Sequence, residues 1–246
     1  MSSLGSAPRA GSAETSPELP YGLSHRDAIQ NYYAWQAEVF AATGKVLDHG
    51  AGSGTLAGAL LRAGVRELVA LEPETKLAAL MRDKFAHAPQ VEVFQGAIDD
   101  YLAHAGPEAI DTVVSSNVLE HIVDDAACLR SVFCLLRAGG KLGVYVPARQ
   151  ELFGSLDRSV GHVRRYALPE LRRKIVAAGF VIDELRYTNL VSVVPWLVAG
   201  RVLKREALGG ESHQLFDRLF PFFAALEKRL RVPYGLNLLA LAHKPK

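Results

Sequence analysis

The sequence predicts an α/β protein built on a doubly wound, mostly parallel sheet. Two observations support this prediction. Between residues 45 and 146, short and nearly continuous apolar runs alternate with helical segments, and a glycine-rich turn follows the first of these runs. Apolar runs without in-and-out alternation are typical of parallel strands, which helices cover on both faces. Ligands bind such sheets at the carboxyl ends of the strands, near the point where the strand order reverses.

The elements follow in order along the chain. Residues 31–42 have the spacing of an amphipathic helix, which ends before Gly44. Five strands are then expected, at 45–49, 67–71, 91–94, 110–115 and 141–146. Helices are expected between them, at 55–63, 74–86, 98–104 and 122–137.

The C-terminal part is less regular. Residues 147–165 are polar and irregular, after which Pro169 opens a helix that Gly179 closes. Strands are expected at 180–187 and 235–242, which brings the total to seven, and an amphipathic helix at 216–230. We expect a single domain over residues 21–246, with segments 148–166 and 188–233 as elaborations on the substrate side.

The composition excludes several classes of function. The chain has 246 residues, of which 28 are basic and 26 acidic, and this balance provides no strong field for a nucleic acid. Residues 1–20 are rich in Ser, Gly, Ala and Pro and are expected to form a disordered tail without a secretion signal. The apolar run 190–200 is too short to span a membrane, so a cytoplasmic protein is expected. The two cysteines lack metal-ligand spacing, so we expect both to be buried as small hydrophobic residues, and we expect no metal.

The glycine turn at Gly50, Gly52 and Gly54 predicts a nucleotide-like ligand. Missing side chains let a ligand lie against the backbone, and the helix that begins near residue 55 directs free N–H groups at it. Glu72, at the end of the second strand, can accept hydrogen bonds from ribose hydroxyls. Residues 52–57 also match a loose dinucleotide pattern, so an NAD(P)-dependent oxidoreductase is the alternative. Asp48 would repel a pyrophosphate but attract an ammonium group, which favours an amino acid moiety.

Four ordered motifs carry a family resemblance: VLDHGAGSG at 46–54, ALEPE at 70–74, DTVVSSNVLEHIVDD at 111–125 and LLRAGGKLGVYVPA at 135–148. Through them the chain resembles class I S-adenosylmethionine-dependent methyltransferases. The resemblance implies a Rossmann-like, seven-stranded sheet with a final antiparallel strand. It also implies S-adenosylmethionine as cofactor and S-adenosylhomocysteine as product.

The resemblance assigns cofactor contacts position by position. The turn Gly50-Ala51-Gly52 with Gly54 would lie under the methionine and ribose, and Asp48 would reach the methionine ammonium. Glu72 would take the ribose hydroxyls. The remaining expected contacts are Pro73, Ala97 and Ile98 at the adenine and the backbone of Asn117 at the methionine end. Ala97 stands where the family usually has an Asp.

Aromatic residues lie just before the glycine turn in the sequence. Tyr32, Tyr33 and Trp35 are most simply core residues of the first helix. As a group they could instead form a lid over the sulfonium, and Tyr33 is therefore included among the expected cofactor contacts.

The motif GHVRRY at 161–166 is similar to one in a bacterial methyltransferase subgroup. His162 is the first candidate for a general base, with Tyr166 in the same motif, and His121, which follows the fourth strand, is a rival. The alternatives are a structural ion-pair cluster around residues 157–165 and, for His121, a helix cap.

The sequence therefore predicts a methyltransferase that acts at oxygen or nitrogen of a small-molecule acceptor with an apolar or lipid-linked portion. A cofactor-binding protein without chemistry is a further alternative. No nucleic acid partner and no membrane span are expected, while peripheral membrane contact stays open, and the chain is expected to be a monomer or a homodimer.

Overall fold

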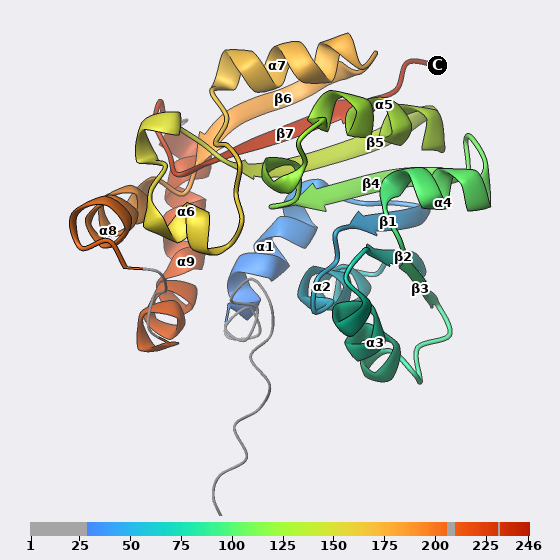
Figure 1. The fold of residues 1–246 in the computed structure, drawn as a ribbon, viewed down its shortest axis with the longest axis horizontal. Helices are drawn as coiled ribbons and strands as arrows, with labels where there is room; N and C mark the ends of the chain where they lie inside the picture. The colour runs from blue at the N-terminus through green and yellow to red at the C-terminus, as the bar shows by residue number, and fades with distance from the viewer. Residues whose placement is uncertain (1–28, 206–209, 231) are drawn as a thin grey trace, which may run out of the picture.

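The computed structural model describes residues 29–205, 210–230 and 232–246, and its centre is a seven-stranded sheet (Figure 1). The strands are β1 (Lys45–His49), β2 (Glu67–Glu72), β3 (Val91–Gln95), β4 (Ile110–Ser116), β5 (Leu136–Pro147), β6 (Val181–Thr188) and β7 (Asn237–His243). Their order is β3-β2-β1-β4-β5-β7-β6. The pairs from β3 through to β5 are parallel, and β7 is antiparallel to both β5 and β6. The predicted fold, including the final antiparallel strand, is confirmed.

Helices connect these strands and cover the sheet. The α-helices are α1 (Gln30–Phe40), α2 (Thr55–Arg62), α3 (Thr75–Lys84), α4 (Ile98–Ala105), α5 (Asp125–Leu135), α6 (Ser155–Ser159), α7 (Leu168–Ala177), α8 (Val193–Leu197) and α9 (Gly210–Leu230). Short 3-10 turns are η2 (Leu119–His121), η3 (Gln150–Leu152) and η4 (Leu190–Ser192), and η5 (Val198–Val202) is a π-helix. In the described part of the chain, none of the helices has the length and hydropathy needed to cross a membrane.

Alternate residues of the buried strands face opposite helical layers, because successive side chains of a strand point to opposite faces. In β2, Val69 and Leu71 pack in a core with α4, α5 and α7, whereas Leu68 packs with α1, α2 and α9. Ala70, on the same face as Leu68, contacts Met81 of α3. Both faces of the sheet are thus covered, which explains the continuous apolar runs in the sequence.

The boundaries of α5 and β5 differ from the prediction. The helix begins at Asp125 rather than 122, because the Asp124 carboxylate accepts a hydrogen bond from the backbone N–H of Ala127 at 2.8 Å and caps it. The strand begins at Leu136 rather than 141. Leu136 pairs with Ile110, and the register then shifts before Thr112 pairs with Lys141. Residues 136 and 137, expected to end the helix, therefore lie in a strand whose pairing is irregular.

Four other differences are smaller. The segment 147–165, expected to be irregular, contains η3 and α6. The amphipathic helix expected at 216 begins at Gly210, and the last strand begins at Asn237 rather than 235. Cys134 is exposed instead of buried. The tail predicted for residues 1–20 lies outside the described residues.

Candidate functional site

A cavity of about 600 Å³ opens at the carboxyl ends of β1, β2 and β4, next to the point where the strand order reverses. This is the place where doubly wound sheets bind ligands. Most of the expected cofactor contacts line it: Gly50, Gly52, Glu72, Pro73, Ala97, Ile98 and Asn117. His121 lines it as well.

The glycine turn is held against β2 by backbone hydrogen bonds. The N–H groups of Gly50 and Ala51 both donate to the carbonyl of Leu71, each at 2.9 Å. Gly50 has φ +70°, and a Cβ on it would lie 2.6 Å from Cγ2 of Val118. Because no other residue fits this conformation and this contact, the wall of the cavity is bare backbone there.

Glu72 ties the glycine turn to the next loop. Its Oε2 accepts a hydrogen bond from the Gly52 N–H at 2.8 Å, and its Oε1 accepts one from the Glu74 N–H at 3.0 Å. The carboxylate is buried and lines the cavity. Each carboxylate oxygen can accept more than one hydrogen bond, so the fixed carboxylate can still receive two vicinal hydroxyls.

A second cavity, of only about 10 Å³, lies behind the glycine turn. Asp48, Tyr33 and Gly50 line it together with Ser116, and Gly50 lines both cavities. A space of this size holds about one water molecule. The buried Asp48 carboxylate therefore lies next to a small polar space that borders the larger cavity through Gly50.

The wall near Ala97 contains an acidic residue that sequence analysis missed. Asp99 lines the cavity two positions after Ala97, at the start of α4, and its Oδ1 accepts a hydrogen bond from the Ser131 hydroxyl at 2.5 Å. The family motif points to Ala97 and Ile98, whereas the signal for Asp99 in the sequence is the pair Asp99-Asp100 in the first turn of the predicted helix. The carboxylate absent from position 97 is thus present on the same wall.

Two residues at strand ends complete the floor. Asn117 has φ +55°, a conformation that Asn adopts more readily than most residues, and its N–H donates to the carbonyl of Tyr145 at 2.8 Å. His49 lies at the end of β1, with Nδ1 3.3 Å from the Ser115 hydroxyl. Burial lowers the pKa of His49 from 6.5 to about 4, so its ring is neutral at neutral pH.

The predicted base, His162, lies in a cluster beside the cavity. Its Nδ1 is 2.9 Å from Oδ1 of Asp157, and its Nε2 is 3.7 Å from Oε1 of Glu120. Its ring meets that of His121 edge to face, with centroids 4.8 Å apart. The Nε of Arg165 donates to the same Asp157 oxygen at 2.7 Å, and these bonds hold the pKa of Asp157 below its usual value in spite of its burial. The structure brings His121 and His162 together, although they are distant in the sequence.

Tyr166 is not in the lining of either cavity. Its buried hydroxyl lies 2.6 Å from Oδ2 of Asp125 and 3.0 Å from the carbonyl oxygen of Leu119. Burial and the Asp125 carboxylate raise the pKa of Tyr166, which keeps the hydroxyl protonated. The hydroxyl thus holds Asp125 at the start of α5, and a catalytic role for Tyr166 stays a prediction.

The aromatic residues of α1 divide into two groups. Tyr32 and Trp35 pack with Tyr145 and Phe220, at centroid distances between 5.0 and 5.9 Å, within the core between α1 and α9. Tyr33 alone among the three lines the small cavity. A lid made of all three is therefore wrong, and core packing is the correct interpretation for Tyr32 and Trp35.

The two elaborations do not line the larger cavity. The segment 148–166 reaches it through His162, which packs on His121. The segment 188–233 makes two other contacts. Its helix α9 packs on α1. The carbonyl of its Gly200 accepts a hydrogen bond from the hydroxyl of Ser155 in α6 at 2.9 Å. A substrate wall formed by residues 188–233 stays a prediction.

Comparisons with known proteins agree with this geometry. A family profile described as a methyltransferase domain matches residues 47–144. A probable S-adenosylmethionine-dependent methyltransferase of Mycobacterium tuberculosis is 31% identical over 139 residues, which are 55% of this chain and 48% of that protein. An uncharacterized methyltransferase of Bacillus mycoides is 32% identical over 101 residues, or 40% of this chain and 45% of that one. The chain thus spans about half the length of the curated relatives it matches.

Solved structures share the fold at lower identity. An S-adenosylmethionine-dependent methyltransferase from Mesorhizobium loti superposes with a TM-score of 0.58 at 15% identity, covering 86% of this chain and 98% of that one. The cyclase SpnF superposes with a TM-score of 0.61 at 18% identity, covering 88% and 80%. Since a protein described as a cyclase has the same fold, the fold by itself does not determine the reaction.

Proposed function

We propose that this chain is a class I S-adenosylmethionine-dependent methyltransferase and that it transfers the methyl group of S-adenosylmethionine to an oxygen or nitrogen atom of a small molecule. The observation that carries the proposal is the larger cavity, where the bare glycine turn and the fixed Glu72 carboxylate lie at the carboxyl ends of β1 and β2. A nucleoside with two free ribose hydroxyls fits this combination.

Each part of the cofactor has a proposed place. The ribose hydroxyls bind Glu72, and the adenine lies against Pro73 and Ile98, with Asp99 able to accept a hydrogen bond from its amino group. The methionine ammonium interacts with Asp48 through the small cavity, which is large enough for one water molecule.

Asp48 also argues against the alternative cofactor. A dinucleotide would place its pyrophosphate on the glycine turn, next to a buried carboxylate that repels it. A cofactor-binding protein without chemistry is disfavoured by the imidazole and carboxylate groups that cluster beside the cavity, because cofactor binding does not require them.

Methyl transfer needs alignment more than it needs a catalytic group, because the sulfonium is already an activated leaving group. Holding the acceptor atom, the methyl carbon and sulfur in line contributes about 7–11 kcal/mol at best. An acceptor that carries a proton must also lose it. We assign this step to the cluster of His121 and His162, where the imidazoles can accept the proton themselves or hold a metal ion that acidifies the acceptor.

The acceptor is proposed to have an apolar or lipid-linked portion. Of the 16 large hydrophobic side chains that are exposed in the described residues, 11 lie between Leu190 and Leu230. Within that range the described charged side chains that are exposed are all basic, namely Arg201, Lys204, Arg205, Arg218, Lys228 and Arg229. Such a surface suits a lipid or an anionic interface. A cytoplasmic location and a monomeric or dimeric state stay predictions.

Calorimetric titration with S-adenosylhomocysteine tests the cofactor assignment. The unaltered protein should bind it, and Glu72→Gln should weaken binding by roughly ten-fold or more, because one carboxylate acceptor and its charge are lost. Heat with NAD but none with S-adenosylhomocysteine would reverse the assignment.

Glu67→Gln is the matched control, because Glu67 is an exposed residue at the opposite end of the same strand, paired with Lys45 at 3.4 Å. Its affinity should equal that of the unaltered protein. Incubation with labelled cofactor and a cell extract then tests catalysis, since label must appear in a product if the protein is an enzyme.

A further inference from the structure

Three metal-ligating side chains meet beside the cavity. Glu120 and His121 belong to η2, which follows β4, and His162 belongs to the loop after α6. Their ligand atoms all lie within 4.8 Å of one another. Two imidazoles and one carboxylate form a ligand set that binds divalent transition metals, including zinc and non-haem iron(II).

The imidazole of His162 is oriented for this purpose. Because the Asp157 carboxylate can only accept a hydrogen bond, Nδ1 of His162 carries the proton in their 2.9 Å contact. Nε2, the second ring nitrogen, faces Oε1 of Glu120 at 3.7 Å and would provide its lone pair to a bound ion. A carboxylate that fixes the second nitrogen of a ligating histidine is typical of metal sites.

The distances suit an ion after a small adjustment. Ligand atoms about 2.0–2.1 Å from a tetrahedral ion are roughly 3.3 Å from each other. The 3.7 Å between His162 and Glu120 is close to this value, and rotation of the His121 ring can shorten the longer separations. Three protein ligands would leave a fourth position open.

Burial and charge also favour a cation. Glu120 and Asp157 are fully buried, and the side chain of His162 is only 9% exposed. Arg165 is bonded to Asp157 and also acts on Glu120 through its charge. The neighbouring Arg164 is bonded to Asp125. An ion bound where the imidazoles and Glu120 meet would add positive charge beside two buried carboxylates, largely away from water.

We propose that Glu120, His121 and His162 bind one divalent transition-metal ion, with Asp157 as the positioning residue. His121 lines the larger cavity, so the open coordination position lies at its edge. The expectation of no metal rests on the two cysteines alone, whereas Glu120, His121 and His162 come from two separate segments and have no recognisable spacing.

What the ion does for the reaction rests on the proposed function. An acceptor hydroxyl bound to it loses its proton to water more readily, since the ion lowers the pKa of the hydroxyl. The resulting oxygen attacks the methyl carbon as the carbon–sulfur bond breaks and its electron pair returns to sulfur, which leaves neutral S-adenosylhomocysteine. In this arrangement Nε2 of His162 is a ligand and does not act as the base.

Titration of the chelator-treated protein with Co²⁺ tests the site. We expect visible absorption bands of low-symmetry cobalt that saturate at one ion per chain, and displacement of the cobalt by Zn²⁺. His162→Ala should abolish the bands, and Asp157→Asn should weaken binding by about 10–100-fold, the usual effect of removing an orienting partner. Equal cobalt spectra for the unaltered and His162→Ala proteins would overturn the proposal, as would a lack of stoichiometric binding.

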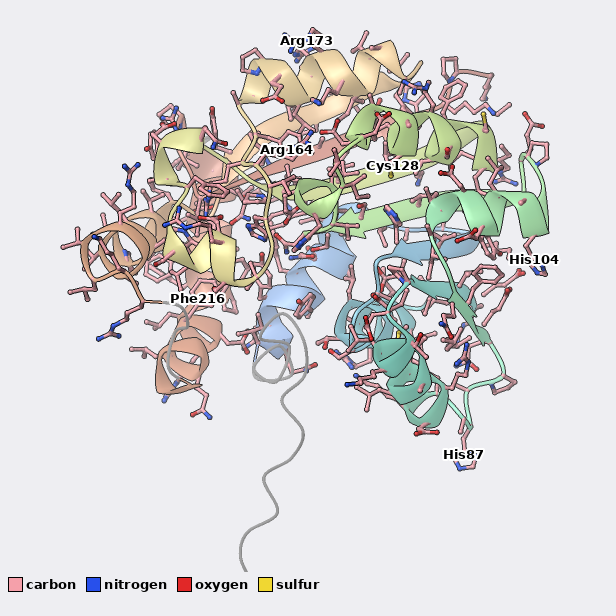
Figure 2. All side chains as sticks on the ribbon, viewed as in Figure 1. His87, His104, Cys128, Arg164, Arg173 and Phe216 are labelled. Atoms are coloured by element: carbon pink, nitrogen blue, oxygen red, sulfur yellow. The ribbon has the colours of Figure 1, made fainter. Side chains whose placement is uncertain are left out.

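His87→Ala is the matched control. His87 is exposed and lies at the far end of the molecule from Arg164, which is in the same loop as His162 (Figure 2). Its cobalt spectrum should match that of the unaltered protein. Titration of each variant with S-adenosylhomocysteine reports whether the fold and the cofactor site are intact. If the protein binds S-adenosylhomocysteine normally but binds no cobalt, the metal site alone is refuted. If it binds cobalt but no S-adenosylhomocysteine, the cofactor assignment alone is refuted.

Discussion

At the scale of single residues, His49 is a titratable side chain that lines the cavity but has a buried ring. It lies at the carboxyl end of β1, and its ring contacts Ser115 rather than a charged partner. Because burial penalises the charged ring, the pKa is lowered to about 4. The free energy of unfolding should therefore depend on pH through the protonation of His49.

The sign of this dependence follows from proton linkage. The unfolded chain binds a proton at His49 near pH 6.5, whereas the folded chain binds it only near pH 4. The free energy of unfolding should thus fall as the pH falls from about 6.5 to 4, by up to about 3 kcal/mol. Urea denaturation of the unaltered protein and of His49→Gln over this range measures it, and the variant should show the shallower slope.

The exposed His87 provides the comparison for this experiment. His87→Gln should retain the full slope of the unaltered protein. If His49→Gln and the unaltered protein lose stability in parallel between pH 6.5 and 4, the ring of His49 is accessible to protons in the folded state and our account of it is wrong.

At the scale of elements, α1 depends on a residue from the opposite end of the chain. No side chain near its own start caps it. Instead, the buried Asp217 of α9 accepts hydrogen bonds from the backbone N–H of Tyr32 at 2.9 Å and of Asn31 at 3.1 Å. A carboxylate at a helix N-terminus satisfies free N–H groups and interacts favourably with the helix dipole.

Loss of this cap should be measurable. Asp217→Ala should lower the free energy of unfolding by about 1–2 kcal/mol, the range for helix caps. Asp217→Asn, which keeps one acceptor oxygen, should lose less. Thermal or urea unfolding checks both variants. The exposed neighbour serves as control, since Arg218→Ala should stay within about 0.5 kcal/mol; an equal loss for positions 217 and 218 would contradict the capping role.

Element boundaries show where sequence patterns reach their limit. Periodicity located α2, α3 and α4 within two residues, because each has its own apolar face and breaker residues. The junction of α5 and β5 was misplaced, since Leu136 pairs with Ile110 and only tertiary pairing decides between helix and strand there. The capping of α1 by Asp217 has no local signal at all.

At the scale of the whole molecule, apolar and basic side chains gather at one end. Figure 1 places α8 and α9 at the same end of the molecule, to the left of the sheet in that view. Of the acidic side chains of α8 and α9 whose burial the structure describes, Asp217 and Glu227 are both buried, and Glu227 accepts hydrogen bonds from the N–H groups of Asn189 and Leu190. Among the charged side chains described there, the exposed ones are basic, which suits an anionic lipid surface.

Sedimentation with vesicles containing phosphatidylserine tests this end of the molecule. The protein should bind them at low salt and dissociate as the salt concentration rises, because exposed charges are screened. Phe222→Ser should reduce the bound fraction several-fold, since Phe222 is 68% exposed on α9.

Val176→Ser is the control, because Val176 is 53% exposed on α7, which packs beside β6. It should bind like the unaltered protein. Equal binding of both variants, or binding to neutral vesicles alone, would refute an electrostatic contact through α9.

The sequence by itself determined the sheet, the glycine turn at its carboxyl edge and several residues that line the larger cavity, because these features depend on neighbouring residues. Apolar runs predicted β1 to β5, and the glycines and Glu72 lie within one strand-turn-helix-strand unit. Only the tertiary structure decided which groups meet beside that cavity. Glu120 and His121 come from one segment and His162 from another, and the hydroxyl of Tyr166 bonds to Asp125. Packing of distant segments sets these contacts, and no local pattern encodes it.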